Sequence, residues 1–137
     1  MKISNIHHIG IAVKDIKKSV ERWKKIFDLN DPCFEEISER GVSVAEFEFE
    51  EGPSLELISP LGENKSLAGF LEKKGEGIHH FCFEVDDINE VVVSLRKAGA
   101  QFVNEKPQKG AGGSLIVFIH PRTVNGVLIE LKQKPKE

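Results

Sequence analysis

The chain has 137 residues, of which 39% are hydrophobic and 30% are charged. These proportions are typical of a globular domain and exclude a disordered chain, which combines low hydrophobicity with high net charge. The formal net charge of -3 disfavours a nucleic-acid partner, which selects a basic surface. Because no apolar run approaches the roughly 18 residues that span a membrane, and no signal-peptide-like stretch opens the sequence, we expect a cytoplasmic protein without membrane association.

The sequence contains an internal repeat. Residues 7–16 read HHIGIAVKDI and residues 79–88 read HHFCFEVDDI, at an offset of 72 residues. An offset slightly over half the chain length predicts two copies of one supersecondary unit. We therefore expect a single domain over residues 1–137, which comprises a first repeat at about 1–60, a connecting segment at 61–77 and a second repeat at about 78–133.

The first repeat opens with a predicted strand over residues 7–13. Apolar residues at spacings of three and four then predict an amphipathic helix over 16–28, with Asp15 as its N-cap. Three strands are expected after this helix, near residues 33–38, 42–49 and 54–58. The connecting segment holds a short predicted helix over 66–74 that stops at Gly75.

The second repeat follows the same order. Its opening strand alternates apolar side chains with His80, Cys82 and Glu84, and Asp87 and Glu90 then form a D-x-x-E pattern that resembles a capping box. We expect Gly99 to end this helix, and strands to follow near 101–104, 113–120 and 127–131. The order βαβββ–βαβββ predicts an α+β fold, with two curved sheets that carry helices on one face and surround a cleft on the other.

Four ionisable side chains occupy matching positions of the two repeats. His8 and His80 lie on the opening strands, on the face opposite the apolar one, and Glu56 and Glu130 lie between apolar neighbours on the closing strands. Four such groups that face one cleft need a counter-charge. Two imidazoles and two carboxylates suit a borderline divalent metal such as Co, Mn, Fe, Ni or Zn. We therefore predict a metal site made of His8, Glu56, His80 and Glu130.

The remaining candidate residues receive less specific predictions. His7 and His79 have the opposite strand phase and are expected to face the helices as structural residues. Cys82 has the phase of His80 and is expected to line the cleft as a small side chain, while His120 is expected to belong to a turn.

Several segments of the chain resemble one family. They are HHIGIAV (7–13), ELISPLG (56–62), SLAGFLEKKGEGIHH (66–80), EVDDI (84–88), KGAGG (109–113) and FIHPRTVNGVLIEL (118–131), which together span nearly the whole chain. The βαβββ repeat resembles the vicinal oxygen chelate superfamily, which includes glyoxalases, bleomycin resistance proteins and dioxygenases, and the segments resemble its methylmalonyl-CoA epimerase family.

The resemblance implies a glyoxalase-like fold, an acyl-CoA substrate, a homodimer and an isomerase that moves a proton at C2 of methylmalonyl-CoA. It also implies that His8, Glu56, His80 and Glu130 bind a divalent cation, typically Co²⁺ or Mn²⁺, although the family also has Gln at the second of these positions. Zn²⁺, Ni²⁺ and Fe²⁺ remain compatible with these ligand types.

The sequence departs from the family at one position. Some members carry a carboxylate two residues after a Gly-Val pair, where this chain has Val44 after Gly41-Val42. Epimerisation needs proton removal on one face of C2 and return on the other, for which two bases are the simplest arrangement. The nearest carboxylates of the same strand phase as Val44 are Glu46 and Glu48. The candidates here are Glu130 and, from its strand phase, Glu46.

Three other functions fit parts of the same pattern. A glyoxalase I-type lactoylglutathione lyase would use the same metal ligands, and the segment 66–80 favours the epimerase over it. An extradiol dioxygenase would use two His and one carboxylate on iron, so the fourth ligand disfavours it. A metal-free binding or resistance protein of this fold would not need the His and Glu set, and metal analysis would identify it.

Overall fold

A computed structural model describes residues 3–135 of the chain. Residues 1, 2, 136 and 137, which the predicted domain includes, lie outside the described residues. The chain forms two compact units, a central unit of residues 9–79 and a terminal unit that, within the described residues, comprises 3–8 and 80–135. The strands β1 and β5 pass from one unit into the other, so each unit holds part of both strands.

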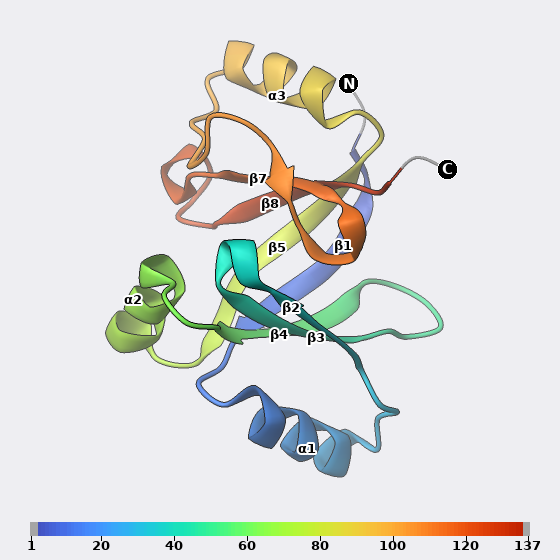
Figure 1. Ribbon diagram of the computed structural model, residues 1–137. Coiled ribbons are helices and arrows are strands. Elements are labelled where there is room, and N and C mark those ends of the chain that lie inside the picture. Colours follow the sequence, from blue (N-terminus) through green and yellow to red (C-terminus); the bar gives the residue numbers. More distant parts are fainter. Residues whose placement is uncertain (1–2, 136–137) are drawn as a thin grey trace. The chain divides into compact units, whose positions relative to one another are not determined.

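The central unit packs one helix on one face of its sheet (Figure 1). Strands β2, β3 and β4 pair antiparallel, and the end of β1 lies next to β4, where the Val13 N–H donates to the Ile58 carbonyl at 2.8 Å. Val20 of α1 packs with Ala45 and Leu57 of the sheet. The elements are β1 (Ile3–Ala12), α1 (Ile16–Phe27), β2 (Cys33–Ile37), β3 (Val42–Phe47), β4 (Ser54–Pro60), α2 (Lys65–Lys74) and the start of β5 (Gly77–Val85).

The terminal unit places helix α3 over the apolar face of its strands (Figure 1). These strands belong to one eight-stranded sheet, where two sheets were expected. Its strand order is β1, β5, β8, β7, β6, in which β5 and β8 are parallel and β7 is antiparallel to both of its neighbours. Ile88 and Val91 of α3 pack with Val117 and Leu131 of the sheet in one buried cluster. The elements after β5 are α3 (Ile88–Lys97), β6 (Gln108–Lys109), β7 (Leu115–Ile119) and β8 (Ile129–Gln133).

The predicted order βαβββ occurs twice along the chain, with α2 in the connecting segment. Both predicted N-caps are confirmed. The Asp15 carboxylate accepts a hydrogen bond from the Lys18 N–H at 3.1 Å, and the Asp87 carboxylate accepts one from the Glu90 N–H at 3.1 Å. Each cap satisfies an amide that has no partner inside its helix, so the two repeats begin their helices in the same way.

Gly99 ends helix α3 as predicted. It has a φ of +101°, its N–H donates to the Arg96 carbonyl at 3.0 Å, and the Ala100 N–H donates to the Leu95 carbonyl at 2.9 Å. These two bonds form a Schellman motif, in which a left-handed residue after the helix satisfies its last carbonyls. Glycine is favoured here because a side chain at this φ would be strained.

The strand predicted near residues 101–104 is wrong. Within residues 3–135, this segment forms an isolated bridge between Phe102 and Ile119, and the edge strand β6 follows only at Gln108–Lys109. The chain runs beside the end of β7, leaves it and returns nearer the start of β7 after Pro107. A strand at this edge of the sheet pairs with β7 alone. Pro107 has no backbone N–H to donate to β7, so the segment does not form a continuous strand.

The last two strands also begin two residues later than predicted. Gly113, the predicted start of one strand, has a φ of +74° and belongs to a short 3₁₀ turn, so β7 starts at Leu115. Val127, the predicted start of the other strand, donates its N–H to the Val124 carbonyl within a turn, so β8 starts at Ile129. In both places a local turn satisfies backbone groups that the predicted strand would have used.

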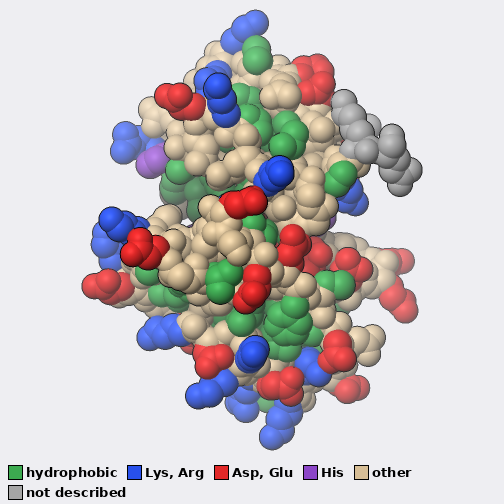
Figure 2. Space-filling view, in the orientation of Figure 1, with side chains coloured by type: hydrophobic (Ala, Val, Ile, Leu, Met, Phe, Trp, Pro, Cys, Tyr) green, Lys and Arg blue, Asp and Glu red, His purple; other side chains and the backbone are tan. Residues whose placement is uncertain are grey.

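No helix within the described residues is long and apolar enough to cross a membrane. Lysine and arginine side chains occur together with aspartate and glutamate over the face in view, so neither sign of charge dominates it (Figure 2).

We predict that Asp87→Ala lowers the free energy of unfolding by about 1 kcal/mol, because the Glu90 amide loses its cap. Asp87→Asn keeps a side-chain oxygen and is the matched control, expected to stay close to the unsubstituted protein. Urea unfolding followed by circular dichroism measures both variants. Equal losses in the two would contradict the assigned capping role.

Candidate metal centre

Three predicted ligands converge in the terminal unit. The Nε2 atoms of His8 and His80 lie 3.0 Å apart, and the Glu130 Oε1 atom lies 3.1 Å from the first and 3.0 Å from the second. The side chains come from β1, β5 and β8, so residues separated by as many as 122 positions meet at one point. These three side chains therefore lie on one face of the sheet, as their strand positions predict.

Strand register explains why Glu130 points to this face. Glu130 pairs with Cys82 in the parallel β5–β8 ladder, two residues beyond His80 on the same side of β5. Its neighbours Ile129 and Leu131 belong to the buried cluster under helix α3. Successive side chains of a strand point to opposite faces. Burial of the two apolar neighbours therefore directs the Glu130 carboxylate to the opposite face.

The three side chains are nearly removed from solvent, at 1% exposure for His8, 3% for His80 and 5% for Glu130. Burial would raise the pKa of the Glu130 carboxyl, but hydrogen bonds from His8 and His80 outweigh that effect and hold the pKa well below its usual range. The carboxylate is therefore ionised in this arrangement. A buried negative charge of this kind is stable only with a partner that carries positive charge or donates hydrogen bonds.

The spacing of the three atoms fits a small divalent cation. An ion that binds its ligands at about 2.1 Å and at right angles places neighbouring ligand atoms about 3.0 Å apart. The observed separations are 3.0, 3.0 and 3.1 Å. The group is also one of the clusters of His, Cys, Asp and Glu atoms in the described residues that could hold a metal ion. Two imidazoles and one carboxylate suit a borderline transition metal.

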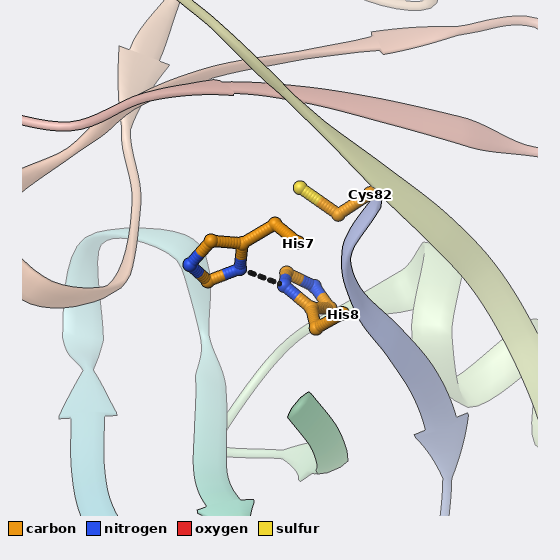
Figure 3. Close-up of side chains that lie close together, drawn as sticks. All are labelled: His7, His8 and Cys82. Atoms are coloured by element: carbon orange, nitrogen blue, oxygen red, sulfur yellow. Dashed lines mark hydrogen bonds between the residues drawn. The ribbon is translucent and has the colours of Figure 1, made fainter. Parts of the chain in front are cut away.

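His7 does not have the purely structural, helix-facing role expected from its strand phase. Its Nδ1 atom lies 2.8 Å from Nδ1 of His8, the two rings meet edge to face, and Cys82 lies close to both (Figure 3). Burial, followed by the nearby Lys132 and His8, lowers the pKa of His7 to about 4. His7 is therefore neutral near pH 7. The doublet of adjacent histidines in the sequence is the signal that could have indicated this contact.

Glu46 and Glu56 lie together in the central unit. They are directly opposite one another in the antiparallel β3–β4 ladder, so their side chains are on the same face. Glu56 is 6% exposed and Glu46 is half-buried. Val44 is buried two positions before Glu46 on the same strand. The predicted ligand Glu56 and the predicted base Glu46 are thus neighbours.

The other histidines take the roles that their positions predict. The His79 ring contacts the Phe70 ring of α2 with a centroid separation of 4.8 Å, as a structural residue would. The His120 Nδ1 accepts a hydrogen bond from the Arg122 N–H at 3.0 Å and so begins a short turn. Cys82 is fully buried beside His7 and His8, which agrees with its small volume.

A first comparison with known proteins identifies the superfamily of this chain. The chain matches the family model of the glyoxalase/bleomycin resistance protein/dioxygenase superfamily over residues 7–118. The twofold βαβββ order and the His, His and Glu cluster agree with this glyoxalase-like fold.

Individual relatives identify the family within this superfamily. The chain is 38% identical over 132 residues to the mitochondrial methylmalonyl-CoA epimerase of Homo sapiens, covering 96% of this chain and 74% of the human protein. It is 36% identical to the ethylmalonyl-CoA/methylmalonyl-CoA epimerase of Cereibacter sphaeroides, covering 96% of this chain and 98% of the relative. A solved methylmalonyl-CoA epimerase in complex with methylmalonyl-CoA and NH₄⁺ superimposes with a TM-score of 0.91 at 30% identity, covering 97% of this chain and 96% of that structure. The chain belongs to the methylmalonyl-CoA epimerase family.

We predict that Glu130→Ala abolishes stoichiometric Co²⁺ binding, because it removes the carboxylate toward which both imidazoles point. The matched control is Glu84→Gln, which changes a partly exposed carboxylate on β5 and is expected to keep Co²⁺. Absorption spectroscopy during Co²⁺ titration measures both variants. Full Co²⁺ content in Glu130→Ala would exclude Glu130 as a ligand.

Proposed function

We propose that this protein catalyses the epimerisation of methylmalonyl-CoA at C2. One observation carries the proposal, namely the identity of 36–38% with named epimerases over nearly the whole chain. The glyoxalase-type lyase and the dioxygenase are not favoured, because the human and Cereibacter sphaeroides relatives, which align over almost the full chain, bear epimerase names. The buried cluster of His8, His80 and Glu130 supplies the ligand types that the reaction needs.

The substrate explains the need for a cation. C2 of methylmalonyl-CoA lies between a thioester carbonyl and a carboxylate, and loss of its proton places negative charge on their oxygens. A divalent cation, Co²⁺ or Mn²⁺ by preference, would supply positive charge that stabilises those oxygens. His8, His80 and Glu130 would hold it, and we keep Glu56 as the proposed fourth ligand.

Two carboxylates are proposed to move the proton. Epimerisation breaks the C2–H bond on one face of the carbon and forms a new C2–H bond on the other, so one group accepts a proton and another donates one. Glu130 and Glu46 are the proposed pair. Glu46 is half-buried on β3, where Glu56 is its cross-strand neighbour, and it is the carboxylate that follows Val44 in the same strand phase. Glu130 serves in this scheme both as a ligand and as a proton-transferring group.

The acyl-CoA is the proposed small-molecule partner. We further propose that the two repeats act as one functional domain and that the protein forms a homodimer. Both of these statements rest on the sequence pattern and the family resemblance.

Proton exchange at C2 tests the function directly. Methylmalonyl-CoA is incubated in D₂O with a catalytic amount of protein and Co²⁺, and the C2 proton is followed by NMR. We expect the C2 signal to disappear and the EDTA-treated protein to be inactive, because the cation stabilises the charge formed on deprotonation.

A folded protein that binds Co²⁺ but gives no exchange would contradict the epimerase assignment, and glyoxalase substrates would then be assayed. A folded protein that takes up no metal and gives no exchange would instead favour the binding-protein alternative. Exchange that persists after complete metal removal would exclude the proposed role of the cation.

We predict that Glu46→Gln lowers the turnover rate at least about tenfold, the low end for a general base, while Co²⁺ stays bound. The matched control is Glu48→Gln, which alters an exposed carboxylate just beyond the end of β3 and is expected to keep full turnover. The C2 exchange rate and the Co²⁺ stoichiometry are measured for both variants. Unchanged exchange in Glu46→Gln would remove Glu46 from the mechanism.

A further inference from the structure

The contact between His7 and His8 requires a proton on one of the two facing Nδ1 atoms. Their Nδ1 atoms are 2.8 Å apart, and the ring planes are inclined by 82° (Figure 3). Two imidazole nitrogens at this distance form a hydrogen bond when one carries a proton and the other has a free lone pair. Because each neutral imidazole has a single N–H, the direction of this bond also fixes the protonation of both Nε2 atoms.

The two possible directions of the hydrogen bond between His7 and His8 have opposite consequences for the Nε2 atom of His8. If His7 donates, the neutral His8 ring carries its proton on Nε2, the atom that faces His80 and Glu130. That Nε2 has no free lone pair and is unable to bind a cation. If His8 donates, its proton is on Nδ1 and its Nε2 lone pair is directed toward the other two ligands. This tautomer suits the site with a cation bound, because the cation would then replace the hydrogen bond from His8 to Glu130.

We propose that His7 is a positioning residue, whose Nδ1 accepts the Nδ1–H of His8 and thereby holds His8 in the tautomer that binds metal through Nε2. This inference rests on the proposed metal site. Histidine ligands commonly donate their second N–H to a neighbouring acceptor, which fixes the ring orientation and raises the basicity of the ligating nitrogen. In this chain, an adjacent residue on the same strand supplies the acceptor.

Because His8 is buried, its Nδ1–H depends on a hydrogen-bond acceptor within the protein. His8 is 1% exposed, so bulk water does not reach its ring freely. Cys82 lies in the same cluster and is fully buried, but a thiol is a weaker hydrogen-bonding group than an imidazole nitrogen. The geometry therefore assigns the acceptor role to His7, while the Cys82 thiol donates to the Phe83 carbonyl at 3.8 Å.

Co²⁺ affinity tests the role of the acceptor. His7→Leu removes the acceptor, His7→Asn keeps a side-chain oxygen at a similar place, and Cys82→Ser is the matched control for changes in the cluster. We expect His7→Leu to bind Co²⁺ about 10–100-fold more weakly, the usual effect of losing such a partner. We expect His7→Asn to recover most of the affinity and Cys82→Ser to keep it.

The tautomer itself is a second readout that a merely structural role would not change. Long-range ¹H–¹⁵N NMR of the protein loaded with Zn²⁺, which is diamagnetic, distinguishes a protonated Nδ1 from a protonated Nε2. The loaded protein is used because His8 Nε2 donates to Glu130 when no cation is bound. We expect the His8 proton on Nδ1 in the Zn²⁺-loaded unsubstituted protein and a proton on Nε2 in His7→Leu at the same Zn²⁺ concentration. Since the first spectrum needs no variant, the proposal stays testable even if His7→Leu does not fold.

Three results would overturn the inference: unchanged Co²⁺ affinity in folded His7→Leu, a His8 proton on Nε2 in the Zn²⁺-loaded unsubstituted protein, or an equal loss of affinity in Cys82→Ser. Failure of the unsubstituted protein to bind Co²⁺ would instead remove the proposed metal site, and this inference with it. Normal Co²⁺ binding by His7→Leu would leave the proposed function intact and reject the positioning role alone.

Discussion

The ionised carboxylate of Glu130, buried at the centre of the terminal unit, is the constraint on which this part of the structure depends. A buried charge is costly unless other groups compensate for it, and here two imidazoles from different strands approach the same oxygen at 3.0–3.1 Å. That arrangement requires β8 to lie parallel to β5 and the start of β1 to belong to the same unit. Removal of any one of these strands would leave the carboxylate without part of its compensation.

The hydrophobic core and the candidate site lie on opposite faces of the same strands. Ile129 and Leu131 pack under α3, and this packing directs Glu130 to the opposite face. Helix α3 is fixed in turn by the Asp87 cap and by the Schellman motif at Gly99. Burial of apolar side chains on one face therefore maintains the convergence of polar side chains on the other, which links stability to the geometry needed for catalysis.

The proposed reaction uses groups of two kinds. The imidazoles of His8 and His80 are neutral ligands for a cation, and the carboxylates are suited to moving a proton at carbon. Glu46 and Glu56 form a second acidic pair, on neighbouring strands of the central unit. His7 adds a proposed function of another kind, because it contacts a ligand of the site and acts on the protonation of that ligand.

The sequence pattern is sufficient to predict the twofold βαβββ order, both helix caps and the common face of His8, His80 and Glu130, because these features follow from local periodicity and from the repeat. It did not predict the interruption between residues 101–104 and β6, because an edge strand depends on a partner strand and on backbone N–H groups that Pro107 lacks. Nor did it predict the contact between His7 and His8. Strand periodicity assigns adjacent side chains to opposite faces, and only the tertiary structure shows that these two imidazole rings meet, because ring orientation depends on side-chain torsions and on packing.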